Sequence, residues 1–222
     1  MPAYAALLRA VNLGGTGKLP MSELQAMCEA EGYAGVRTYI ASGNVVFHAG
    51  LAEAQVKAAL ERRLHGYAGK PVRVLVRTPA ELARILAANP FPDEAPNRTI
   101  AILLDHAPPA DALLAVTRQQ GERLALGERE IYVAYGNGMA DSKLRIPAGD
   151  AGTGRNMNTL ARLATMAGAL DVGWPGPPPA PLARAATPPG TRSRPVGSST
   201  IQGAPDSSTH TPSGCFTGRT SS

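Results

Sequence analysis

Strand-like and helix-like segments alternate in a fixed order along the first 78 residues of the chain. Apolar runs predict the strands, and apolar residues at helical spacing predict the helices. Pro20 suits the first position of a helix, and Ser42-Gly43 suits a tight turn between two strands. In chain order we expect a strand over 3–11, a helix over 20–32, strands over 36–40 and 45–49, a helix over 52–64 and a strand over 72–76. This βαββαβ order is that of a ferredoxin-like unit.

The following residues predict a second unit of order βαββα. Thr78-Pro79-Ala80-Glu81 matches a capping box, so a helix begins there and runs to about residue 88. Beyond it we expect a strand over 99–104, a helix over 110–120, a hairpin of 122–125 with 131–135, and a helix over 156–169. The sequence therefore predicts an α+β protein with two compact halves, a ferredoxin-like subdomain over 1–78 and a second α+β subdomain over 79–170.

Residues 171–222 differ in composition from the rest of the chain. They contain 10 Pro, 7 Gly, 8 Ser and 7 Thr among 52 residues, and no Lys or Glu. Such a segment buries too little apolar surface to offset its chain entropy, so we expect a disordered tail. We expect this tail to be a dispensable extension. The alternative is that it serves as a peptide ligand for another protein or binds nucleic acid.

The charge balance is mildly basic. The whole chain has 22 Lys+Arg against 17 Asp+Glu, a net charge of +5, which is below the strong bias of a dedicated DNA-binding protein. Aromatic residues make up 5%, too few for the stacking surface of an RNA-recognition sheet. Two Cys and four His do not suffice for a Cys/His zinc site, and we expect no cofactor. No apolar run is long enough to span a bilayer and no secretory signal is evident, so we expect a cytoplasmic protein.

The first candidate binding site is a Gly-rich loop between a strand and a helix, where backbone N–H groups favour anions. The loop fits neither the P-loop nor the dinucleotide pattern. In the expected sheet it lies beside the turn that joins the second and third strands. The candidate residues at this edge are Asn12, Gly14, Gly15, Lys18, Ser42, Gly43 and Asn44. Alternatively, these side chains only satisfy the backbone groups of their own turns.

The second candidate is the start of the last predicted helix. Arg155 lies there beside Asn156, and a cation is unfavourable at the positive end of a helix dipole. A bound anion, with Lys143 as a further ligand, would resolve this conflict. The alternative is an Arg155 that points outward or pairs with Asp141 or Asp150.

No recognisable catalytic motif is present, so enzyme activity is uncertain. The four His are scattered, and Cys28 shares an apolar helix face, which favours a core position. Our functional hypothesis is a binding module for a small anionic ligand, phosphorylated or nucleotide-like. The alternatives are a weak nucleic-acid-binding protein and an enzyme of an unrecognised class. The sequence does not indicate an oligomeric state.

Several motifs together resemble one family. They are LLRAVNLGG, KLPMSEL, RTYIASGNVVF, VLVRTPAEL, ANPF, SKL and TGRNMNTLARLA, which occur in this order within about residues 3–170. The chain thus resembles the bacterial domain of unknown function 1697 family. The resemblance implies a cytoplasmic α+β protein with two subdomains, and it implies no reaction or ligand. Family members usually have Gly where Ala10 stands, and many have Gln at Ala41 and Trp at Met157.

Overall fold

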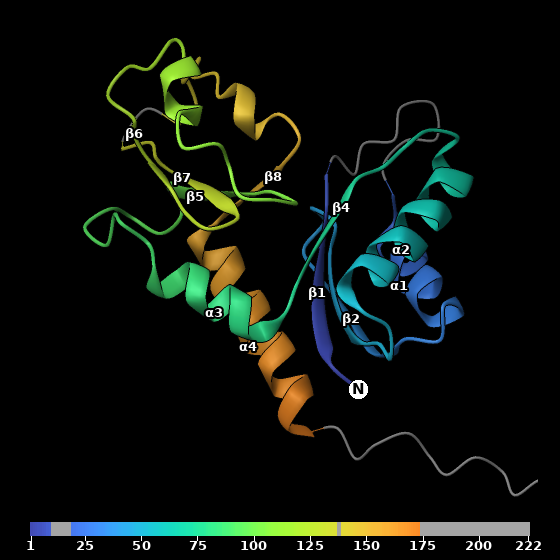
Figure 1. Cartoon of the computed structure of the whole chain (residues 1–222). Coiled ribbons are helices and arrows are strands. Elements are labelled where there is room, and N and C mark those ends of the chain that lie inside the picture. The colour runs from blue at the N-terminus through green and yellow to red at the C-terminus, as the bar shows by residue number, and fades with distance from the viewer. Residues whose placement is uncertain (10–18, 137–138, 174–222) are drawn as a thin grey trace, which may run out of the picture. The chain divides into compact units, whose positions relative to one another are not determined.

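The computed structural model describes residues 1–9, 19–136 and 139–173 (Figure 1). All of them belong to one compact unit, Met1–Pro178. Within these residues the protein is α+β, with four α-helices and two four-stranded antiparallel sheets. The elements are β1 (Ala3–Leu8), α1 (Met21–Ala30), β2 (Ala34–Tyr39), β3 (Asn44–His48), α2 (Glu53–Ala68), β4 (Val74–Arg77), α3 (Pro79–Ala87), β5 (Thr99–Leu103), η2 (Ala112–Ala115), β6 (Arg123–Leu126), β7 (Glu130–Ala134), η3 (Pro147–Gly149), β8 (Thr153–Asn156) and α4 (Met157–Gly173).

The first sheet has the strand order β2-β3-β1-β4. Every residue of β1 and β3 is buried, because both faces of this sheet are covered. Side chains alternate between the faces of a strand. Tyr4, Ala6 and Leu8 therefore join the core under α1 and α2, while Ala5 and Leu7 join a second core on the opposite face. The predicted β-α-β-β-α-β element order of the first half is confirmed.

The second sheet repeats this strand order, as β6-β7-β5-β8. The helix expected over 110–120 is wrong: only the short 3-10 helix η2 forms there. After it Val116 has an extended backbone, and Thr117 and Arg145 exchange backbone hydrogen bonds. Arg118 then takes a left-handed conformation with a φ of 58°, so the helix does not continue. A helix of this length has little stability of its own, so such tertiary pairing overrides it.

Strand β8 was not expected from the sequence. The fourth strand arises because Thr153–Asn156 pairs with β5, with Arg155 opposite Ala101. Arg155 therefore lies in a strand and not in the last helix, which begins at Met157. The predicted order βαββα for the second half therefore lacked one strand, β8.

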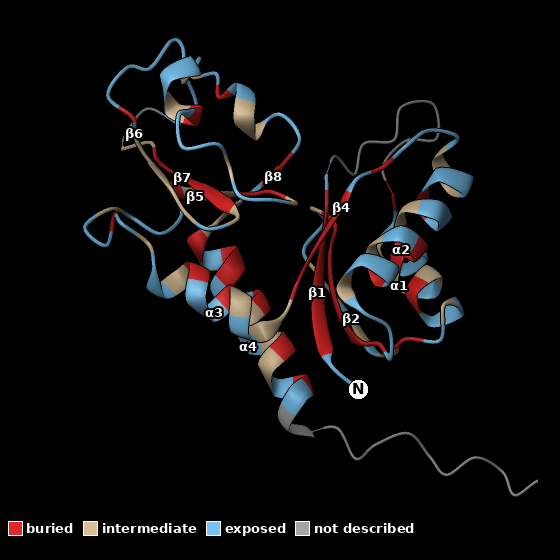
Figure 2. Ribbon diagram, in the orientation of Figure 1, coloured by how far each residue is buried: buried red, intermediate tan, exposed pale blue. Residues whose placement is uncertain are grey.

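Helices α3 and α4 pack against each other between the two sheets (Figure 1). Figure 2 shows buried residues on β1 and on α3 and α4. One apolar core joins both sheets through these helices and includes Ala5, Leu7, Val46, Leu82, Ile85, Ala101, Leu103, Tyr132, Leu160 and Leu163. Leu75 of β4 and Leu103 of β5 both belong to this core, and the charged residues described below lie at the ends of these strands.

The expected boundary between residues 78 and 79 falls where β4 leads into α3. Whether the two halves fold independently stays a prediction. The expectation for the tail, apart from residues 171–173 at the end of α4, lies outside the described residues.

Candidate functional site

Arg155 reaches from the second sheet to the first. Its Nε donates a hydrogen bond to Asn44 Oδ1 at 2.7 Å, and its Nη2 donates to the carbonyl oxygens of Leu8 at 2.8 Å and Ser42 at 2.7 Å. The structure thus brings together Ser42, Asn44 and Arg155, three residues that the sequence analysis placed in two separate candidate sites.

The guanidinium of Arg155 has no N–H group left over. Its Nη1 donates to Thr153 Oγ1 at 2.8 Å and to the Gly154 carbonyl at 2.9 Å, so five acceptors match the five donors. All five acceptors are neutral, and burial lowers the pKa of Arg155 to about 10. The expected alternative pairing with Asp141 or Asp150 does not occur among the described residues. This arrangement makes Arg155 a tie between the sheets, and its contact with an anion stays a prediction.

The other predicted site residues divide into two groups. Asn12, Gly14, Gly15 and Lys18 lie outside the described residues. Among the described ones, the Gly43 carbonyl accepts the Leu8 N–H, and Asn156 Oδ1 accepts the Thr159 N–H and so caps α4. Lys143 is exposed, and no hydrogen bond or ion pair joins it to Arg155 in the described part of the chain.

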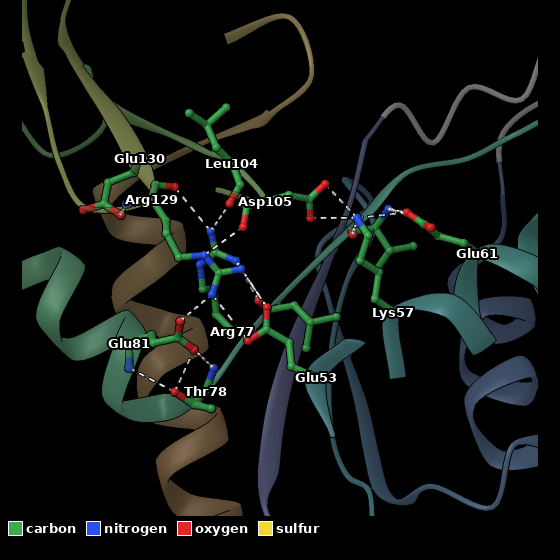
Figure 3. Close-up of polar contacts among 12 residues, drawn as sticks. Glu53, Lys57, Glu61, Arg77, Thr78, Glu81, Leu104, Asp105, Arg129 and Glu130 are labelled. Carbon is green, nitrogen blue, oxygen red and sulfur yellow. Dashed lines mark hydrogen bonds and ion pairs between the residues drawn. The ribbon is translucent and has the colours of Figure 1, made fainter. Parts of the chain in front are cut away.

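A larger charged cluster, which the sequence did not reveal, lies where α2 and β4 meet the ends of β5 and β7 (Figure 3). We call it the inter-sheet cluster; it consists of Glu53, Lys57, Glu61, Arg77, Glu81, Asp105 and Arg129.

Arg77 is the buried centre of this cluster, with a side chain only 1% exposed. It ends β4 and donates to the carbonyl oxygens of Val76, Leu104 and Arg129. Burial lowers the pKa of Arg77, and the neighbouring charge of Arg129 lowers it further. The bonds to Leu104 and Arg129 join the end of β4, in the first sheet, to residues beside β5 and β7 in the second sheet.

Arg129 lies beside Arg77 and forms ion pairs with Glu53 and Glu81. Its Nη2 lies 2.7 Å from Glu53 Oε1, and its Nη1 lies 3.0 Å from Glu81 Oε1. The hydrogen bond to Glu53 raises the pKa of Arg129, against the effect of burial. Because Glu53 opens α2 and Glu81 lies in α3, Arg129 joins three parts of the fold.

Glu81 both caps α3 and binds Arg129. Its Oε2 accepts the Thr78 N–H at 2.9 Å, which confirms the predicted capping box, while its Oε1 accepts from Arg129. Burial alone would raise the pKa of Glu81, but the two hydrogen bonds from Thr78 and the charges of Arg77 and Arg129 outweigh it and lower the pKa.

Lys57 joins α2 to Asp105, which lies two residues beyond the end of β5. Its Nζ lies 2.7 and 2.9 Å from the two Asp105 oxygens, 3.1 Å from Glu61 Oε1 and 2.9 Å from the Val74 carbonyl. Four acceptors therefore surround the three N–H donors of the ammonium group.

Two adjoining cavities run along α2, and we call them together the α2 groove. One has a volume of about 550 Å³ and the other about 470 Å³. The first is lined by Lys57, Glu61, Arg62, His65, Pro71, Val72, Arg73 and Asp105, and the second by Glu53, Ala54, Lys57, Ala58, Glu61, Asp105, His106 and Arg129. Both include Lys57, Glu61 and Asp105, so the two cavities adjoin at these three side chains.

In the described part of the chain, no helix combines the length and the apolar character that a membrane span needs. The described residues also contain no group of three or more His, Cys, Asp or Glu side chains suited to hold a metal ion.

The fold defines an α+β protein in which two four-stranded antiparallel sheets share a pair of helices. The chain belongs to the family described as "Protein of unknown function (DUF1697)", which matches residues 1–132. This match confirms the resemblance seen in the motifs. No curated protein matches the chain.

A solved structure has the same fold. The conserved bacterial protein SP0830 from Streptococcus pneumoniae is 22% identical in sequence, with a TM-score of 0.62, and the similarity covers 74% of this chain and 98% of that chain. At this identity the similarity shows the fold alone.

Proposed function

We propose that the chain is a binding protein for a small anionic ligand, phosphorylated or nucleotide-like, and that the α2 groove holds it. The observation that carries this proposal is the basic end of the groove, where Arg62, His65 and Arg73 line one cavity. Concave sites with a few convergent polar groups are the usual places for small ligands.

The basic side chains at this end have few competing partners. Arg62 is 71% exposed, and its contact with Glu31 is long at 3.8 Å, a kind of ion pair that contributes little. Arg73 makes no side-chain hydrogen bond or ion pair with another described residue. An arginine with a free fork binds two oxygens of a phosphate or carboxylate at once.

The acidic residues of the same cavity do not cancel this charge. Glu61 and Asp105 both contact Lys57 Nζ, so part of their charge is compensated within the protein. The arginines remain to attract an anion.

Three finer statements remain proposals. The strand order β2-β3-β1-β4 and its antiparallel pairing support a ferredoxin-like first half. Independent subdomains over 1–78 and 79–170, and a cytoplasmic location, are predictions without a test so far.

A thermal-shift titration tests the binding proposal. Inorganic phosphate and ribose 5-phosphate should raise the melting temperature, and unphosphorylated ribose should not, because only a ligand that binds the folded state stabilises it. Arg73→Ala should weaken binding about tenfold or more, the effect of losing one charge-assisted contact. Arg63→Ala is the matched control, since Arg63 lies on α2 but bonds Glu31 and does not line the groove.

Two results would overturn the proposal: no anion raises the melting temperature, or Arg73→Ala and Arg63→Ala bind as the wild type does. Salt separates it from the alternative of nucleic-acid binding. Affinity for a ligand with one phosphate falls little between 50 and 200 mM salt, whereas nucleic acid held by several phosphates loses about a thousandfold or more.

A further inference from the structure

We infer that the ligand of the α2 groove is a ribonucleoside monophosphate. This inference rests on the proposed function and assigns the class of ligand to the same groove. Its basis is the order of three chemically different surfaces along α2.

The groove is longer than a phosphate group. Its lining on α2 runs from Glu53 to His65, which corresponds to about 18 Å at the rise of an α-helix. The two cavities adjoin at Lys57, Glu61 and Asp105, so a ligand held at the basic end would reach the second cavity by lying over these side chains.

The middle of the groove offers acceptors and no spare donor. The Asp105 and Glu61 side chains are 33% and 32% exposed, and a carboxylate oxygen has room for two hydrogen bonds. Lys57 uses its donors on these carboxylates and on Val74 (Figure 3). This surface fits hydroxyl groups, as those of a ribose, and it repels a second anionic group.

The far end combines two small apolar side chains with the planar groups of a histidine and an arginine. Ala54 and Ala58 are exposed and lie one turn apart on the same face of α2. His106 and Arg129 line the same cavity, and the guanidinium of Arg129 is held in place by Glu53 and Glu81. Imidazole and guanidinium planes stack on the rings of nucleobases.

The three surfaces therefore match phosphate, sugar and base in the order in which a nucleoside 5′-monophosphate carries them. A bare phosphate uses only the first surface, and ribose 5-phosphate uses the first two. Stacking of the base should strengthen binding about tenfold over ribose 5-phosphate. Loss of the 2′-hydroxyl should weaken it several-fold, by about the effect of one hydrogen bond to a carboxylate.

Titration calorimetry on the full chain tests this inference. The ligands are the four ribonucleoside 5′-monophosphates, their 2′-deoxy counterparts, ribose 5-phosphate and inorganic phosphate. We expect at least one ribonucleotide to bind about tenfold more tightly than ribose 5-phosphate and several-fold more tightly than its deoxy form.

A variant locates the base. Ala58→Leu fills the far end of the groove and should weaken nucleotide binding about tenfold while ribose 5-phosphate binding stays within about twofold. Ala161→Leu, at an exposed position of α4, is the matched control and should change neither. The melting temperature of each variant without ligand shows whether it is folded.

The outcomes separate the two claims. If ribose 5-phosphate binds as tightly as every nucleotide, or if the deoxy forms bind equally well, the nucleotide inference is wrong and the anion-binding proposal stands. If none of the phosphorylated compounds binds, the proposed function itself fails.

Discussion

Replacing Arg155 by Ala removes the polar tie between the two sheets. Three of its hydrogen bonds cross to the first sheet, to Asn44, Leu8 and Ser42. Bonds from a charged donor contribute about 1.5–3 kcal/mol each. The burial that lowers the pKa of Arg155 to about 10 offsets about 3 kcal/mol of this stabilisation. We expect Arg155→Ala to lower the free energy of unfolding by about 2–6 kcal/mol, and the melting temperature by about 4–24 °C.

Urea denaturation without ligand measures this loss. Arg162→Ala is the matched control, because it removes the same charge from an exposed position of α4 and should change stability by less than about 0.5 kcal/mol. Arg155→Lys keeps the charge but not the planar fork, so it should show most of the loss. If Arg155→Ala unfolds within about 0.5 kcal/mol of the wild type, the tie contributes nothing and the reasoning fails. Arg155 would then be free for a ligand, as the sequence analysis supposed.

Three further expectations concern pH, thiol reactivity and the tail. Glu81 has a folded-state pKa below its ordinary value of 4.5, so its carboxylate stabilises the fold fully above pH 4.5 and less as the pH falls through the folded-state pKa. Glu81→Gln should therefore be less stable than the wild type in urea at pH 7, and a difference in stability that does not narrow at pH 3.5 would contradict this. Burial raises the pKa of Cys28 to about 12, so in a Cys215→Ser chain a thiol reagent should label Cys28 roughly a hundredfold more slowly in native buffer than in urea, and equal rates would refute a core position. A chain that ends at Pro178, the last residue of the compact unit, should melt within about 2 °C of the full chain, and a larger drop would show that the tail contributes to the fold.

The fold of the first half could be read from the sequence because local and tertiary preferences agree there. β1 and β3 are buried on both faces, so their apolar runs are continuous, and the capping box at Thr78 marks the start of α3 without ambiguity. β8 could not be read, because Thr153–Asn156 includes Gly and Asn, which seldom favour strands, and pairing with β5 alone makes it extended.

The candidate site was less accessible to sequence reasoning. Sheet topology placed Ser42 and Asn44 at one edge, but how the second half docks decides that Arg155 meets them. The inter-sheet cluster has no local signal, since Arg129 and its partner Glu53 are 76 positions apart. Only the spacing of Glu53, Lys57 and Glu61 at intervals of four along a helix could have suggested one charged face.

The central claim is that an anion binds at the basic end of the α2 groove, and the ring signals of the histidines test it most directly. His65 lines that end, His106 lines the far end, and His48 is buried in the first sheet. In a nuclear magnetic resonance titration with inorganic phosphate, with signals assigned from single His→Gln variants, the His65 ring signal should shift and saturate while those of His48 and His106 stay in place. A His65 signal that does not move at saturating phosphate, or equal shifts of all three, would contradict the account.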